Sequence, residues 1–436
     1  MERLRRCNLF GVETGESIIL GSLNREAMPQ ASTITRDAAP LKVVVVLSAM
    51  MAFASISTDI YLPALPTLKQ AFAESSANVE WTLSGFLVGF SIGQLLWGPI
   101  SDRYGRRLPM LAGIVLFIIG SMGCAAATTL WHLIGWRVIQ AAGACAGPVI
   151  ARAMARDLYG RDRAAQLLST LMLVMGIAPL LGPLVGAQVL HVGSWRTLFW
   201  MLAVIGAVMI AAVWRLPESL PADRRSTTPI QAALAGYGVL LRNRTIMAYA
   251  LASGFYYAGL YAYLAGTPFA YITYYKVPAD AYGLLLGLGI IGQMALNLIN
   301  RRYVVQLGSE RMFRWGATLV AVSGLWSGAA AWTGVGGLPG LVVPLFVFLS
   351  ANGLFIANAV AGAMEAQPDR AGATSALVGS IQFGSGIFGS ALVGWFADGT
   401  PRSMGAVIAV TGVCSVVAAQ FVSRKTRSTA AIIQQC

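Results

Sequence analysis

Twelve apolar runs of about twenty residues recur along this chain, and they constrain its fold more than any other feature. A bilayer core about 30 Å thick needs helices of this length. Only helices and closed barrels satisfy their backbone groups in lipid, and barrel strands are shorter. We therefore predict an all-α integral membrane protein with twelve transmembrane helices. The predicted spans lie near residues 41–64, 80–100, 108–127, 131–151, 165–189, 195–214, 245–268, 281–300, 311–331, 338–360, 372–396 and 403–422.

Composition supports this prediction and excludes several classes of protein. Hydrophobic residues make up 56% of the chain and charged residues only 11%, against about 25% charged residues in soluble domains. The 5 cysteines follow no disulfide or metal-ligand pattern. We find no nucleotide-binding motif, metal cluster or nucleophile–base pair, so we expect no enzyme activity, no cofactor and no nucleotide.

Basic residues are distributed unevenly between the two sides of the predicted membrane. The net charge of +13 is scattered between apolar runs, which indicates membrane topology and not a nucleic-acid partner. With both termini in the cytoplasm, only Lys69, Arg196, Lys276 and Arg402 fall outside and Arg137 falls within the membrane, leaving 26 of the 31 basic residues inside. This asymmetry follows the positive-inside rule and favours an even number of spans.

The chain divides into two related halves. The predicted domains are a polar cytoplasmic tail expected to be disordered (1–38), a six-helix bundle (39–214), a cytoplasmic linker (215–244), a second six-helix bundle (245–424) and a cytoplasmic tail (425–436). Met28 is an alternative start. The stretch that begins at Gly93 aligns without gaps with the stretch that begins at Gly292, an offset of 199 residues. We therefore predict two parallel six-helix repeats, as in secondary transporters.

Two ionisable residues are predicted inside apolar spans, Asp59 in span 1 and Arg137 in span 4. Charges in a membrane are costly and indicate function by default. Asp59 can respond to burial by binding a proton, whereas Arg137 stays charged and needs an anion, polar groups or water. The alternatives are that Asp59 caps a helix near water and that Arg137 extends to the interface. Gln140 and Gly143 continue the Arg137 face and indicate close helix packing.

A basic turn follows span 2. Its notable residues are Gly98, Asp102, Arg103, Gly105, Arg106 and Arg107. Gly105 permits a tight turn, Asp102 can cap a helix, and the arginines suit a cytoplasmic interface. From composition alone, this segment is equally consistent with an ordinary positive-inside loop.

Span 5 carries a run of glycine and proline. The run comprises Gly176, Pro179, Gly182, Pro183 and Gly186. Such residues bend a membrane helix and allow a neighbour to approach closely. General helix packing is the simpler alternative.

Span 7 is rich in aromatic residues. Phe255, Tyr257 and Tyr261, together with Tyr61 of span 1, are our candidates for lining a substrate pocket. Tyr257 and Tyr261 are four residues apart and share a helix face, which suits apolar ligands that contain rings. Aromatic residues nearer to position 271 fit an interfacial belt instead.

These motifs together resemble the major facilitator superfamily, and within it the twelve-span drug:proton antiporters of the bicyclomycin-resistance type. The resemblance covers about residues 40–425. It rests on Gly98–Arg107 (G-x-x-x-D-R-x-G-R-R), Arg137–Gly143 (R-x-x-Q-G, with the glycine displaced), Gly182–Gly186 (the end of G-x-x-x-G-P-x-x-G), Asp59–Pro66 of span 1 and Leu251–Phe255 of span 7. Ala178 stands where the span 5 motif expects its first glycine, and Gly176 is displaced.

The resemblance implies export of small molecules in exchange for protons by alternating access. Asp59 and Arg137 would couple proton movement, and Asp102 and Arg106 would help to latch the halves. The implied setting is a bacterial inner membrane, with lipid, protons and a small-molecule substrate as partners and a monomer as the working unit. Export of an endogenous metabolite and proton-driven uptake remain alternatives; a channel, sensor or membrane enzyme fits the sequence poorly.

Overall fold

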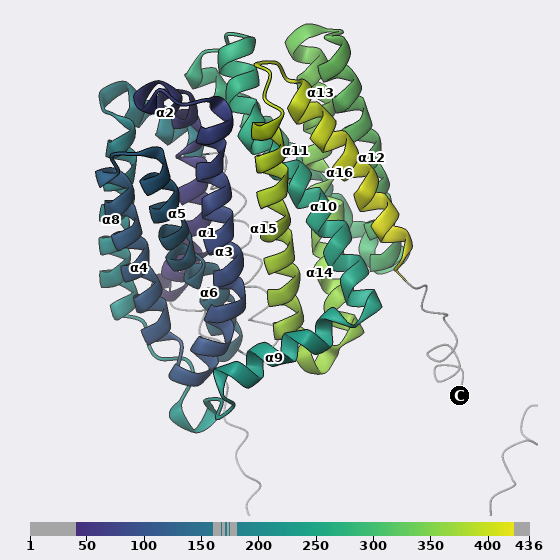
Figure 1. The fold of residues 1–436 in the computed structure, drawn as a ribbon. Coiled ribbons are helices and arrows are strands. Elements are labelled where there is room, and N and C mark those ends of the chain that lie inside the picture. The colour runs from purple at the N-terminus through teal and green to yellow at the C-terminus, as the bar shows by residue number, and fades with distance from the viewer. Residues whose placement is uncertain (1–40, 160–166, 168–170, 172–173, 175–180, 423–436) are drawn as a thin grey trace, which may run out of the picture. The chain divides into compact units, whose positions relative to one another are not determined.

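The computed structural model describes residues 41–159, 167, 171, 174 and 181–422, and every regular element in this part of the chain is helical. In chain order (Figure 1), the elements are α1 (Leu41–Asp59), η1 (Leu62–Ala64), α2 (Leu65–Phe72), α3 (Ser76–Tyr104), α4 (Arg107–Ala126), α5 (Leu130–Ala144), α6 (Ala146–Leu158), the apolar helix Leu181–Val192, α8 (Trp195–Trp214), η2 (Ala222–Arg224), α9 (Ile230–Leu241), α10 (Arg244–Thr267), η3 (Pro268–Tyr274), α11 (Ala279–Leu307), α12 (Ser309–Thr333), α13 (Gly337–Ser350), α14 (Asn352–Ala366), η4 (Pro368–Arg370), α15 (Ala371–Trp395) and α16 (Arg402–Gln420).

Each of the twelve predicted spans coincides with helix in the described residues. Nine of these segments are long and apolar enough to cross a membrane, with α1–α2, α5–α6 and α13–α14 each counted as one span. The other three predicted spans correspond to α10, α12 and the helix Leu181–Val192. The chain is therefore an all-α, multi-pass membrane protein with two repeats of six spans, which we call the first repeat (α1 to α8) and the second repeat (α10 to α16).

Helix ends differ from the predicted span limits where polar residues continue a helix beyond the apolar run. Span 4 was predicted to end at residue 151, but the helix continues to Leu158, so Arg152 and Arg156 lie on α6 and not in a loop. Helix α3 likewise starts at Ser76, so Glu80, the first residue of predicted span 2, lies one turn inside the helix and not at its end. The prediction that Asp59 and Arg137 are the two ionisable residues within spans is therefore wrong. Hydropathy marks the apolar run, whereas hydrogen bonds between backbone groups set the helix length.

Helices α3 and α11 have corresponding forms in the two repeats. Each contains 29 residues, from 76 to 104 and from 279 to 307. A glycine with positive φ follows each helix, Gly105 at +90° and Gly308 at +85°. Each of these two long helices therefore ends at a glycine that permits a tight turn.

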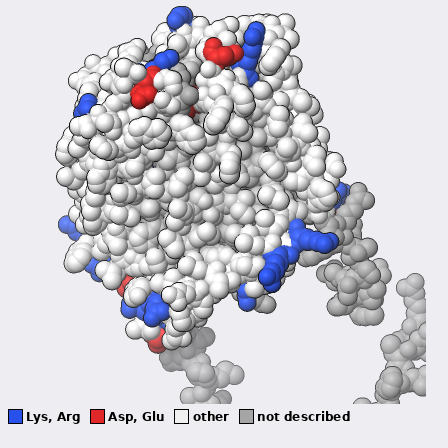
Figure 2. Space-filling model, viewed as in Figure 1, with Lys and Arg blue, Asp and Glu red and all other residues white. Residues whose placement is uncertain are grey.

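We call the end of the bundle that contains α9 and the turn from α3 to α4 the turn end, and the end that contains α2 and the loop after α15 the far end (Figure 1). Figure 2 shows Lys and Arg gathered at the two ends of the face in view, with a band between them that is almost free of charge. Large apolar side chains are exposed along the helices, such as Val208 at 63%, Leu298 at 67% and Phe388 at 70%. A surface of this kind suits lipid as the solvent.

The repeats contact each other chiefly through α3 and α15, which lie side by side in Figure 1. The Ser84 and Ser390 hydroxyls are 2.7 Å apart, and Ser91 Oγ donates to the Ser380 carbonyl oxygen at 2.8 Å. Small hydroxyl side chains allow the helices to approach while satisfying their polar groups within the interface. At the turn end, α9 packs against both of these helices.

Candidate functional site

Asp59 is the last residue of α1, at a break in the helix. Pro63 has no N–H to donate to the Asp59 carbonyl oxygen, and the chain continues as the short helix η1. Only 7% of Asp59 is exposed, and its buried Oδ2 atom has no hydrogen-bond partner among the residues that the structure describes. An ionised carboxylate in apolar surroundings is strongly disfavoured unless donors or a cation compensate it. Asp59 is thus suited to binding and releasing a proton.

The glycines of the helix Leu181–Val192 pack directly against Asp59. A Cβ atom added at Gly182 would lie 2.6 Å from Cβ of Asp59, and one at Gly186 would lie 2.1 Å from the Ile60 carbonyl oxygen. No side chain fits at these distances. The glycines predicted to soften span 5 therefore allow its close approach to the break in α1. Pro183 lies between them on the same helix, whereas Gly176 and Pro179 lie outside the described residues.

The second repeat faces Asp59 with tyrosine side chains. Tyr261 of α10 and Tyr282 of α11 are near enough to interact with Asp59 electrostatically. Tyr282 is fully buried, and its hydroxyl lies 3.3 Å from Thr267 Oγ1. Asp59 therefore lies at the interface between the repeats, which is where alternating access requires a coupling group to be.

An aromatic cluster lies beside this interface and includes two of the four predicted pocket residues. The rings of Tyr257 and Tyr261 are 6.3 Å apart, and Phe383 of α15 lies 5.3 Å from Tyr257. Phe90 of α3 lies 4.3 Å from Phe383, so the cluster joins both repeats. Phe255 is half-buried and has no ring contact with this cluster among the described residues. The sequence spacing could not predict Phe90 or Phe383, because they come from other helices.

Arg137 is fully buried within the first repeat, among aromatic rings. Its guanidinium carbon lies 4.3 Å from the centre of the Tyr61 ring and 4.4 Å from that of Phe86. Its Nη1 donates to Gln140 Oε1 at 2.8 Å, and Gln140 Nε2 donates to Ser121 Oγ at 2.8 Å. Cation–π contacts of this kind are worth about 2 kcal/mol or more when desolvated. Tyr61, a predicted pocket residue, thus contacts Arg137 and not the aromatic cluster.

The structure contains no ion pair between Asp59 and Arg137, although the sequence hypothesis gave the two residues a shared role. Arg137 is 0% exposed and therefore does not extend to the interface, and its Nε and Nη2 atoms have no hydrogen-bond partner among the described residues. These two nitrogen atoms carry three N–H groups. Gly143, further along α5, allows α4 to approach: a Cβ atom there would lie 2.4 Å from the Phe117 nitrogen.

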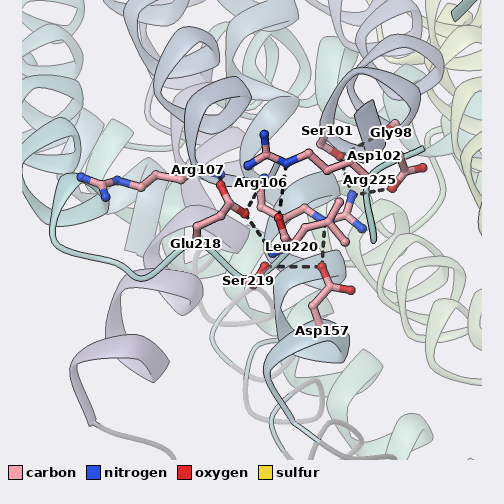
Figure 3. Close-up of polar contacts among 10 residues, drawn as sticks. All are labelled: Gly98, Ser101, Asp102, Arg106, Arg107, Asp157, Glu218, Ser219, Leu220 and Arg225. Atoms are coloured by element: carbon pink, nitrogen blue, oxygen red, sulfur yellow. Dashed lines mark hydrogen bonds and ion pairs between the residues drawn. The ribbon is translucent and has the colours of Figure 1, made fainter. Parts of the chain in front are cut away.

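A second polar cluster stands at the turn between α3 and α4 (Figure 3). Arg106, which is 7% exposed, donates from Nη1 to Asp102 Oδ1 at 2.5 Å and to Ser101 Oγ at 2.8 Å. Its Nε donates to Asp157 Oδ2 at 2.7 Å. Two carboxylates therefore fix one guanidinium and join the α3–α4 turn to the end of α6. Gly98 contributes the carbonyl oxygen that accepts from Ser101.

Glu218, which follows α8, caps the start of α4. Its two carboxylate oxygens accept hydrogen bonds from the backbone N–H groups of Arg106 and Arg107 at 2.8 and 3.1 Å, and from that of Leu220 at 3.0 Å. Partial burial would by itself raise the pKa of Glu218, but these three donors and the nearby Arg225 guanidinium outweigh burial, so the pKa is lowered. The carboxylate also complements the positive end of the helix dipole.

Gly105 is the residue that this capping requires. Its φ is +90°, and a Cβ atom there would lie 2.8 Å from Glu218 Oε2. The other two arginines of the turn, Arg103 and Arg107, do not contact the carboxylates that hold Arg106. Arg107 lies over the Trp214 ring at 4.9 Å, and Arg103 lies near the Tyr104 ring.

Two acidic residues of the second cluster, Asp157 and Glu218, are absent from the sequence analysis. The excess of arginine in the turn was the one available signal, because a carboxylate is a common partner of a buried guanidinium group. That signal does not tell which acids in the chain supply the carboxylates.

The fold and the buried charges define a membrane transporter built from two six-helix repeats. Residues 47–275 match the Major Facilitator Superfamily. YdgK, an uncharacterised MFS-type transporter of Bacillus subtilis (strain 168), is 32% identical over 83% of this chain and 90% of its own length. A bicyclomycin resistance protein homolog of Haemophilus influenzae is 27% identical over 84% of this chain and 92% of its own. The xylose transporter XylE from E. coli, in a partially occluded inward-open conformation, shares the fold with a TM-score of 0.70 at 17% identity, covering 87% of this chain and 96% of XylE.

The chain belongs to the Major Facilitator Superfamily. It is therefore a transporter of small molecules and not an enzyme, and the fold predicted from the sequence is confirmed. The relatives are bacterial proteins that align over most of both lengths.

Replacement of Gly186 by leucine should lower the melting temperature of the purified protein, because the side chain would overlap the Ile60 carbonyl. Overpacking of this kind costs about 1–3 kcal/mol. Leucine at Gly135, an exposed position with no atoms within 4 Å, is the matched control and should leave the melting temperature unchanged. The melting temperature of each variant is measured from the fraction of protein that remains monodisperse in size-exclusion chromatography after heating. Equal melting temperatures would show that the helices do not pack in this way.

Lysine in place of Arg137 should destabilise the first repeat by roughly 1–3 kcal/mol, because an ammonium group cannot both stack on two rings and donate to Gln140. Arg196→Lys is the control, because the Arg196 guanidinium also lies over an aromatic ring, that of Trp195 at 4.2 Å, but Arg196 is exposed to solvent. Thermal unfolding followed by tryptophan fluorescence compares them. A larger effect at Arg196 would contradict the aromatic enclosure of Arg137.

Glutamine in place of Glu218 should lower the melting temperature at pH 7 by the equivalent of about 1 kcal/mol or less, the usual range for a helix cap. Because the folded-state pKa is lowered, the ionised group stabilises the fold above its ordinary pKa of 4.5, and this contribution disappears as the pH falls through the folded value. The difference between wild type and variant should therefore shrink in melting curves recorded from pH 7 to pH 4. A difference independent of pH would show that Glu218 acts through shape alone.

Proposed function

We propose that this transporter exports small apolar molecules that contain aromatic rings, including antibiotics, in exchange for protons. The likeness to a bicyclomycin resistance protein homolog supports export of drugs. The cluster of Tyr257, Tyr261, Phe90 and Phe383 supports a substrate with rings, because aromatic side chains bind such ligands by stacking and apolar contact.

The observation that carries the proposal is the unpartnered carboxyl oxygen of Asp59 at the interface between the repeats. In the arrangement described here, Asp59 has tyrosines near it and no cation, which favours its protonated form. In the alternate arrangement, the free N–H groups of Arg137 or water would stabilise the ionised form. Asp59 would thus bind a proton on one side of the membrane and release it on the other as the repeats rock.

In this proposal the far end faces the exterior and the turn end faces the cytoplasm of a bacterial inner membrane, with both termini inside. The excess of arginine at the turn end supports this orientation. Protons entering along the membrane potential supply about 2.3 kcal/mol per charge for each 100 mV. The transporter would then need neither ATP nor a cofactor, and one chain with two repeats would form a complete pathway.

The cluster around Arg106 would act as a latch at the cytoplasmic side. Its hydrogen bonds join α3, the end of α6 and the segment after α8, and Ser226 N donates to the Asp102 carbonyl oxygen at 2.8 Å. The linker (215–244) includes α9, whose Tyr237 hydroxyl donates to the Leu95 carbonyl oxygen at 3.3 Å. Movement of one repeat would therefore be transmitted to this cluster through the linker.

Asparagine in place of Asp59 should abolish proton exchange while the protein still folds, because asparagine matches the shape of the protonated acid but cannot release a proton. Inverted membrane vesicles energised in the presence of a pH-sensitive dye, with a panel of antibiotics, provide the measurement. Wild-type vesicles should show dye recovery on addition of a transported compound, and Asp59→Asn vesicles at most one tenth of it. Asp398→Asn, on an exposed loop, is the control and should match wild type. Full recovery with Asp59→Asn would overturn the assignment.

A further inference from the structure

A second buried carboxyl group, Glu80, lies between the repeats at the far end. Glu80 is in the second turn of α3 and is only 2% exposed, and its Oε2 atom has no hydrogen-bond partner in the described part of the chain. The motifs that predict proton coupling do not include it. Its environment differs from that of Asp59, which faces the glycines of the helix Leu181–Val192.

Among the described residues of the first repeat, Glu80 alone lines a small cavity of about 30 Å³. The other lining residues belong to the second repeat, and they include apolar side chains such as Phe269 and Met404 and the hydroxyl-bearing Thr400 and Ser403. A cavity of this size holds about one water molecule. The site is therefore large enough for the water molecule that would deliver a proton, and too small for a drug. Because its lining comes from both repeats, the cavity exists only while they are in contact at the far end.

No cation compensates Glu80. The titratable or charged side chains on the segments around it are Lys69, Glu74, Tyr261, Tyr263, Tyr271, Asp398 and Arg402. Glu74 accepts a hydrogen bond from Asn78, Asp398 accepts from Thr400, and the Arg402 guanidinium lies over the Trp332 ring. None of the seven donates a hydrogen bond to Glu80, and no charged group in the described residues acts on it. Ionised Glu80 would thus be a buried charge without a partner, which is strongly disfavoured.

Separation of the repeats would remove this penalty. The serine pair Ser84 and Ser390, one turn of α3 further into the bundle, is part of the same contact between the repeats. If this contact opens, water reaches the carboxyl group and its ionised form becomes the favourable one. The closed far end therefore binds one more proton than the open far end, and mass action makes their ratio depend on external pH.

We propose that Glu80 and its cavity form a second proton-binding site, separate from Asp59, which is occupied when the far end is closed and empty when it is open. The proposal rests on the alternating access of the proposed function but not on the identity of the exported compound or on the role of Asp59. A proton bound here comes from the exterior and favours closure on that side.

The distance between spin labels at the far end tests the proposal without any transport assay. Labels are attached to cysteines at Gln70 on α2 and Thr333 on α12, both exposed, with serine in place of Cys7, Cys414 and Cys436 and the buried Cys124 and Cys145 retained. In the purified wild-type protein, two label-to-label distances are expected, one for the closed and one for the open far end. The ratio of the closed population to the open population should fall up to tenfold per pH unit as the pH rises. Glu80→Gln, which resembles the protonated acid, should shift the ratio toward the closed state and reduce its dependence on pH between pH 5 and pH 9.

Two further variants make the result specific. Glu80→Asp retains a carboxyl group and should restore a pH-dependent ratio. Because Asp59 also binds a proton in the proposed function, the comparison is repeated in an Asp59→Asn background. The pH dependence that remains in Asp59→Asn should be lost in the double variant with Glu80→Gln. A pH-independent wild-type distance, or the same dependence in Glu80→Gln as in wild type, would overturn the proposal.

A change of distance on replacing KCl by NaCl at constant pH, lost in Glu80→Gln, would assign the site to Na⁺ and overturn the assignment to a proton. If Glu80→Gln does not fold, the comparison of wild type with Glu80→Asp decides: identical profiles would overturn the proposal, and a shifted midpoint would support it.

Discussion

The cost of placing a charge in an apolar interior governs the arrangement of this transporter. Arg137 lies on two aromatic rings and bonds to Gln140, and Arg106 is held by two carboxylates. Asp59 and Glu80 have no such partner for one carboxyl oxygen each. Arg106 is thus compensated by carboxylates, and Arg137 by aromatic rings and one amide oxygen although its Nε and Nη2 atoms have no partner among the described residues. The two groups that can lose their charge by binding a proton have no cation beside them in that part of the chain. This difference follows from chemistry, since a carboxyl group can be neutral at moderate pH and a guanidinium cannot.

Close helix packing gives these uncompensated groups their isolation from water. Gly182 and Gly186 bring a helix against Asp59 and Ile60 at distances that no side chain permits. The glycines therefore do more than bend the helix, because they remove the space in which water could solvate the carboxyl group. The same helix faces the second repeat, where a Cβ atom at Gly283 would lie 2.7 Å from the Leu184 side chain. A movement between the repeats would consequently change the hydration of Asp59.

The turn end follows the opposite principle, with every carboxylate of its cluster paired. Arg106, Asp102, Asp157 and Glu218 come from four segments and satisfy one another and the start of α4. Paired charges of this kind fix geometry more than they add stability, because their attraction largely offsets the cost of desolvation. The cluster can therefore position the segment after α8, and with it the linker, relative to the first repeat.

The sequence by itself determined the class of protein, the number of spans, the two-repeat fold and the residues Asp59, Arg137 and Gly105. These features depend on local properties: the length of apolar runs, the cost of a charge within them, and the need for positive φ at a turn. Tertiary structure alone decided the enclosure of Arg137 by Tyr61 and Phe86 and the burial of Glu80 against the second repeat. Each of these depends on which helices meet, and residues far apart in the chain come together only when the helices pack. The four residues that precede Glu80 in α3 change hydropathy little, but the packing of this helix end decides which groups face one another.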